Sequence, residues 1–170
     1  MNVLIADYPA EVQKILGKYP SDQKRSAVMP LLYLAQNKLG YLTKESMEDV
    51  GEITGMQVTE VASIVGYYTL FHDRPGGRYR LQVCTDLSCA MRGAEEFLQK
   101  MCTNLGIRLG ETTADGLITI EEVTCLAGCD HAPMFQVQGD GEIVYHENMT
   151  EVKAMALVNT LRAAGKEAGA

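Results

Sequence analysis

Four of the five cysteines fall into two close pairs, and this spacing constrains the fold more than any other feature. Four residues separate Cys84 from Cys89, and three separate Cys125 from Cys129. Thirty-five residues lie between the pairs, so the fold must return the chain to one place if all four thiols are to meet. In a cytoplasmic protein, where disulfides are disfavoured, clustered cysteines are typical of metal sites or redox groups.

The segments around the pairs predict how the chain returns. Tyr79, Leu81 and Val83 alternate with polar residues, which is typical of a strand that leads into the first pair. An amphipathic helix is expected over 93–105, and a second strand over 117–123 leads to the second pair. Such a crossover is right-handed with parallel strands. Both pairs therefore start where a strand ends, at the sheet edge that usually binds ligands.

The rest of this half completes a familiar layout. Strands are expected over 134–138 and 142–145, joined by a Gly139-Asp140-Gly141 turn. Thr150 caps a last helix, and the tail 163–170 is expected to fray. The order strand, helix, strand, strand, strand, helix is that of a thioredoxin-like sheet.

The first 72 residues predict a small helical bundle. Helices are expected over 12–19, 21–39 and 44–54, with a fourth that begins at Thr59. Ser21 and Thr43 are the expected caps, and Pro30 should kink or split the second helix. Short loops between helices favour antiparallel neighbours. This half contains no cysteine, and we expect a docking module without chemistry of its own.

The Gly- and Pro-rich stretch 73–78 marks a boundary between the halves. We therefore expect an α+β chain with two domains, a helical bundle over 1–77 and a thioredoxin-like α/β domain over 78–170.

The paired thiols suit a [2Fe–2S] cluster, which needs four thiolates, two for each iron. Ala127 and Gly128 are small enough to let the second loop wrap closely. Structural zinc, a disulfide or thiol redox chemistry, and coincidence remain alternatives on spacing alone, although zinc knuckles are usually tighter. Cys102 falls on the inward face of the helix over 93–105, where a free thiol behaves as a small hydrophobe.

Charge and hydropathy exclude several classes of function. The formal net charge is −7, which argues against nucleic acid as the main partner. No apolar run approaches the roughly 18 residues of a membrane span. The start of the chain lacks the features of a signal or transit peptide, so the expected location is the cytoplasm.

The cysteine segments resemble the small thioredoxin-like [2Fe–2S] subunit of NADH:quinone oxidoreductase, respiratory complex I. The resemblance covers about residues 10–162. The segments that carry it are Val83-Cys84-Thr85, Cys89-Ala90-Met91-Arg92-Gly93-Ala94, Cys125-Leu126-Ala127-Gly128-Cys129-Asp130-His131-Ala132-Pro133-Met134, and, in the helical half, 24–32 and 66–71.

The resemblance implies one [2Fe–2S] cluster, bound by the four paired cysteines, which exchanges single electrons with the flavin of a partner subunit. That partner would bind FMN and NADH within a larger respiratory complex, on the cytoplasmic side of the inner membrane. The chain would be an enzyme only through its complex, with no catalytic residues of its own. Similar subunits of NAD-dependent formate dehydrogenases and NAD(P)-coupled hydrogenases remain alternatives, as does a zinc-stapled interaction module.

Four positions beside the ligands have two interpretations each. Asp86 stands where family members often carry a small neutral residue, so its carboxylate either opposes reduction or points into solvent. Arg92 and His131 flank the loops and either offset the cluster's charge or remain ordinary surface side chains. The Ala132–Pro133 bond precedes a strand, and its isomer is left open.

Overall fold

The computed structural model describes residues 2–167. The chain forms two compact units, Met1–Pro75 and Gly76–Ala170, and each is described by itself.

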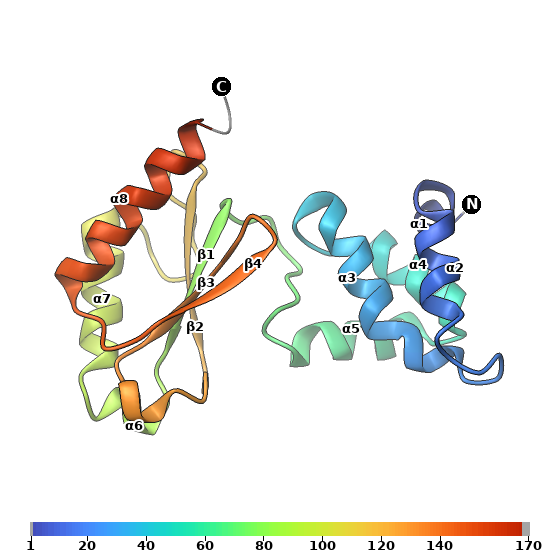
Figure 1. Ribbon diagram of the computed structural model, residues 1–170, viewed down its shortest axis with the longest axis horizontal. Helices are drawn as coiled ribbons and strands as arrows, with labels where there is room; N and C mark the ends of the chain where they lie inside the picture. Colours follow the sequence, from blue (N-terminus) through green and yellow to red (C-terminus); the bar gives the residue numbers. More distant parts are fainter. Residues whose placement is uncertain (1, 168–170) are drawn as a thin grey trace. The chain divides into compact units, whose positions relative to one another are not determined.

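The first unit is a small helical bundle, as predicted. Its helices are α1 (Val3–Asp7), α2 (Pro9–Leu16), the 3-10 helix η1 (Lys24–Ala27), α3 (Val28–Leu39), α4 (Lys44–Thr54) and α5 (Val58–Tyr67) (Figure 1). Apolar side chains from all six of these helices contribute to its core, among them Val12, Leu31, Leu32, Val50 and Val61. Burial of these faces against one another stabilises helices that are too short to persist alone.

Helix α4 has the predicted bounds, and the two helices before it differ from the prediction. The Thr43 hydroxyl accepts the Ser46 amide N–H at 3.1 Å and caps α4. The expected helix over 21–39 instead has no cap at Ser21 and consists of η1 and α3. Pro30 lies in the first turn of α3, where a missing amide N–H costs no intrahelical hydrogen bond. Helix α2 ends at Leu16 rather than at residue 19, and α1 was not predicted.

The second unit is built on a four-stranded mixed sheet in the order β2-β1-β3-β4. Its strands are β1 (Tyr79–Cys84), β2 (Ile118–Val123), β3 (Phe135–Gly139) and β4 (Glu142–His146). Strands β1 and β2 are parallel, while β3 and β4 form an antiparallel hairpin beside β1, which confirms the predicted topology. The α+β, thioredoxin-like fold class is thereby confirmed.

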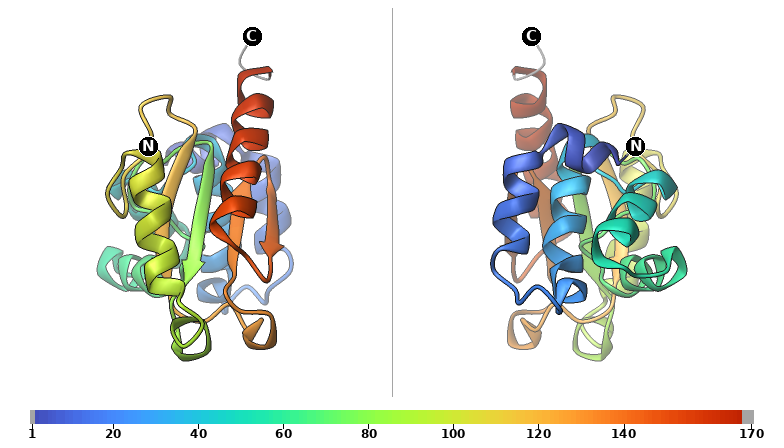
Figure 2. Two further views of the ribbon diagram at one scale, coloured as in Figure 1. Left: turned by 90° about the vertical axis from the view of Figure 1, so that its left-hand side faces the viewer. Right: turned by 90° about the vertical axis from the view of Figure 1, so that its right-hand side faces the viewer.

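Two helices, α7 (Ala94–Leu105) and α8 (Glu151–Glu167), cover one face of the sheet (Figure 2, left). Phe97 and Met101 from α7, together with Val158 from α8, pack on Ile120 and Phe135 of the sheet. The packed sheet is the scaffold that positions the loops at its ends.

Several bounds in this unit differ from those expected. Helix α8 continues to Glu167, so the fraying expected from residue 163 is wrong for 163–167, and residues 168–170 lie outside the described part. The short helices α6 (Leu87–Ala90) and η2 (Cys129–His131) were not predicted. The Ala132–Pro133 peptide bond is cis. No helix within residues 2–167 is both long and apolar enough to cross a membrane.

Candidate metal centre

The two cysteine loops leave the same end of the sheet. In the parallel pair β1 and β2, Cys84 lies opposite Val123, so the loops that follow start side by side. Figures 1 and 2 show both loops together at this end, with α6 in the first and η2 in the second. The fold therefore returns the chain to one place, as the spacing of the cysteines requires.

The first pair lies inside the protein. Cys84 is the last residue of β1 and Cys89 lies on α6, and each is only 2% exposed. Ala94, Ala132 and Met134 form a small apolar cluster around them. Burial and the neighbouring Cys84 thiol raise the pKa of Cys89 to about 11. A metal that binds here has to displace a proton, as thiolate ligation generally requires.

The second pair is exposed and has the geometry of two ligands on one ion. The Sγ atoms of Cys125 and Cys129 are 3.8 Å apart. Two thiolates bound to one tetrahedral metal ion at about 2.3 Å would lie roughly 3.8 Å from each other. The amide N–H of Ala127, whose φ of 61° is left-handed, donates to the Cys125 Sγ at 3.3 Å. Such amide hydrogen bonds stabilise thiolate charge.

The two pairs lie close to each other. Helix α6 packs against η2, and Cys129 is near enough to Cys89 to raise its pKa electrostatically. The described residues hold no group of three or more His, Cys, Asp or Glu side chains gathered around one ion. A pair from each loop instead suits a binuclear core in which each iron takes two thiolates. The residues present therefore fit a [2Fe–2S] cluster.

The flanking residues behave differently from one another. Asp86 begins α6, yet its carboxylate caps no amide within the described chain and is among the charges that raise the Cys125 pKa. This electrostatic effect indicates that the Asp86 carboxylate lies near the second pair. The His131 Nε2 lies 3.3 Å from the Asp130 carboxylate, on the surface.

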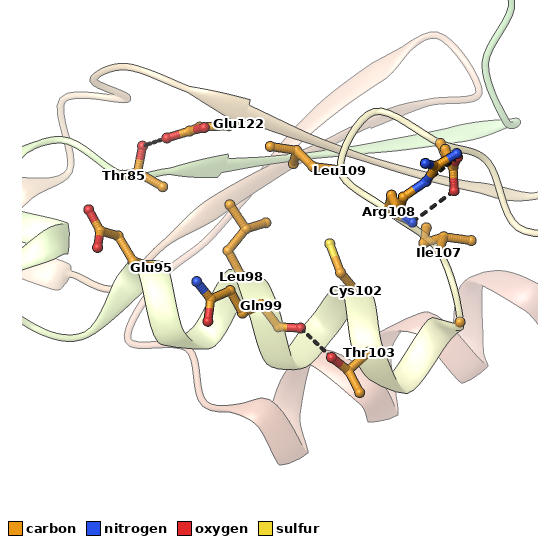
Figure 3. A pocket seen from close by; sticks show the side chains of 12 residues that line it. Thr85, Glu95, Leu98, Gln99, Cys102, Thr103, Ile107, Arg108, Leu109 and Glu122 are labelled. Atoms are coloured by element: carbon orange, nitrogen blue, oxygen red, sulfur yellow. Dashed lines mark hydrogen bonds and ion pairs between the residues drawn. The ribbon is translucent and has the colours of Figure 1, made fainter.

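Cys102 lies away from the four paired thiols. It is half-buried on α7 and lines a cavity of about 920 Å³ together with Leu98 and Leu109 (Figure 3). Burial raises the pKa of this thiol. Cys102 was predicted on the inward face of its helix, and in the structure its side chain lines the wall of this surface cavity.

Two contacts between the loops were missed at the level of sequence. The Thr85 hydroxyl donates to the Glu122 carboxylate at 2.5 Å (Figure 3), and an Arg92 Nη1 donates to the Ala132 carbonyl at 3.2 Å. The parallel register of β1 and β2 could have suggested the first contact, because it places residues 85 and 122 near each other. No sequence signal marks the second.

The chain is similar in sequence to proteins of known family. The family model described as thioredoxin-like [2Fe–2S] ferredoxin matches residues 12–162. The E 2 subunit of NADH-quinone oxidoreductase from Rhizobium meliloti (strain 1021) is 41% identical over 91% of this chain and 88% of its own. NADH-quinone oxidoreductase subunit 2 of Thermus thermophilus is 38% identical over 89% of this chain and 82% of its own.

A solved structure shares the fold. The NAD+-reducing [NiFe]-hydrogenase in its H2-reduced state matches 83% of this chain with a TM-score of 0.65 and 18% sequence identity. This chain spans 23% of the hydrogenase chain, and at that identity the likeness concerns the fold alone.

Proposed function

Because the chain belongs to the thioredoxin-like [2Fe–2S] ferredoxin family, we propose that it is an electron-transfer subunit of an NADH:quinone oxidoreductase. One [2Fe–2S] cluster would be held by Cys84, Cys89, Cys125 and Cys129. The observation that carries this assignment is the 3.8 Å separation of the outer Sγ atoms, with the buried pair beside them. When bound, the cluster supplies one-electron chemistry between ferric and ferrous iron.

The two cysteine pairs would have different roles in binding the cluster. Cys84 and Cys89 anchor it from the protein interior, where Met134 and Ala132 exclude water. The exposed Cys125 and Cys129 form the side from which electrons enter and leave. The Ala127 amide aimed at the Cys125 sulfur offsets part of the charge that reduction adds.

The proposed partner is the flavin- and NADH-binding subunit of the same complex, which would hold FMN and carry out the hydride chemistry. Leu87 and Met91 support a docking surface near the cluster, since these apolar side chains are 72% and 81% exposed on and just after α6. The helical unit, proposed as the domain 1–77, would serve in docking. The whole assembly would lie on the cytoplasmic side of the inner membrane.

Analysis of the purified full-length chain tests the assignment. We expect iron and acid-labile sulfide in equal amounts, about two of each per chain, and an EPR signal that appears on reduction. A colourless protein that contains one zinc ion would contradict the proposal and support a zinc-stapled interaction module.

Asp86 provides a second test. Four thiolates, two sulfides and two ferric ions carry a charge of about −2, and reduction makes it about −3, so a nearby carboxylate opposes reduction. Asp86→Asn is expected to raise the midpoint potential by tens of millivolts, measured by redox titration. The matched control is Glu142→Gln, an exposed acid at the start of β4, at the far end of the sheet. Equal potentials in both variants would refute this role for Asp86.

A further inference from the structure

The second cysteine loop is anchored on the first loop at both of its ends. At its beginning, the Thr85 amide N–H donates to the Val123 carbonyl at 3.2 Å, beside the bond from the Thr85 hydroxyl to Glu122. The cysteines that would bind the outer iron come directly after this anchor.

At the end of the loop, two further hydrogen bonds come from the first loop. The Cys84 amide N–H donates to the Met134 carbonyl at 3.2 Å, and Arg92 donates to the Ala132 carbonyl at 3.2 Å. Ala132 is 2% exposed and lies three residues after Cys129. A shift of the Ala132 carbonyl would therefore also move Cys129. Arg92 is therefore the side chain that ties the first loop to the end of the second loop, next to Cys129.

Arg92 also brings a fixed positive charge to a site that is strongly negative when loaded. The planar guanidinium is pre-organised, so it loses less side-chain entropy for each hydrogen bond it makes than a flexible ammonium does. The positive charge opposes the −2 to −3 charge of the cluster and favours the reduced state.

We propose that Arg92 is a positioning residue for the cluster: it fixes the outer cysteine loop through the Ala132 carbonyl and raises the cluster's reduction potential through its charge. This inference rests on the proposed function. It assigns two effects to Arg92, one on the lifetime of the cluster and one on its reduction potential. Different substitutions of Arg92 can separate these two effects.

The test uses the full-length, cluster-loaded chain with Arg92→Gln and Arg92→Lys. The matched control is Arg108→Gln, because Arg108 is highly exposed and pairs with Glu111 away from the cysteine loops. One measurement follows the loss of visible absorbance in the presence of an iron chelator, and the other is the midpoint potential.

Arg92→Gln is expected to lose the cluster at least about tenfold faster, as is typical when a residue that orients metal ligands is removed, and to shift the potential to more negative values. Arg92→Lys is expected to keep the potential of the unsubstituted chain, because the charge remains, but to lose the cluster faster. Arg108→Gln is expected to change neither quantity.

Three outcomes would overturn the role of Arg92. These are an Arg92→Gln chain that matches Arg108→Gln in both measurements, an Arg92→Lys chain with the cluster lifetime of the unsubstituted chain, or a fall in potential as large with lysine as with glutamine. If Arg92→Gln fails to accumulate, the Arg92→Lys chain decides alone. An unsubstituted chain without iron would instead refute the proposed function.

Discussion

Replacement of Cys89 by alanine is expected to abolish the visible absorbance of the chain and to destabilise its second unit by more than about 4 kcal/mol. Cys89 is 2% exposed, so in the proposed site its loss would leave one iron short of a ligand inside the protein. The free energy of metal binding is part of the folding free energy of a small metal domain. Loss of the cluster therefore also lowers the stability of the second unit. Iron analysis and thermal unfolding followed by circular dichroism measure the two effects.

Cys102→Ala is the matched control, since it removes a half-buried thiol from the same unit. This variant is expected to keep full iron and sulfide content. Loss of the cluster in the Cys102 variant, or its retention in the Cys89 variant, would contradict the assignment of the ligands.

Phe135→Ala is expected to destabilise the second unit by about 3–5 kcal/mol, the usual cost of truncating a buried aromatic side chain. Phe135 is fully buried in the interior strand β3, with its ring stacked at 6.2 Å on Phe97 and 5.4 Å from His146. It also follows Met134, whose carbonyl accepts the Cys84 amide, so the cavity opens directly behind the cluster site.

Denaturant unfolding followed through the visible absorbance of the cluster isolates the second unit, because the first unit carries no cysteine. Tyr145→Ala is the control, since Tyr145 lies on the neighbouring strand β4 and is 52% exposed. Its expected cost is below about 1 kcal/mol. Equal losses in the two variants would show that Phe135 does not hold the sheet in this way.

The sequence was most informative where a pattern repeats. The alternation through Tyr79 and Leu81 predicted β1, and the cap at Thr43 with the stop after Thr54 predicted α4 to the residue. Helix α6 has four residues, too few for any helical period, and its conformation depends on the loop it closes. No local signal could therefore have revealed it.

The sequence could not predict that one cysteine pair is buried and the other exposed. Both pairs stand in short loops with small neighbours, and spacing treats them alike. What buries Cys84 and Cys89 is contact with Ala94 of α7 and with Ala132 and Met134, which lie on one segment after the second pair. Contacts of this kind depend on the assembled fold, and the same holds for the bond from Arg92 to Ala132.

The exposure of the second pair also decides where the site is vulnerable. Oxidants attack accessible thiolates first, so we expect peroxide to modify the exposed Cys125 and Cys129 before the buried pair. Cys84 and Cys89 are each 2% exposed, so the surrounding protein shields the inner thiols from the same oxidants and confines the first damage to the second pair.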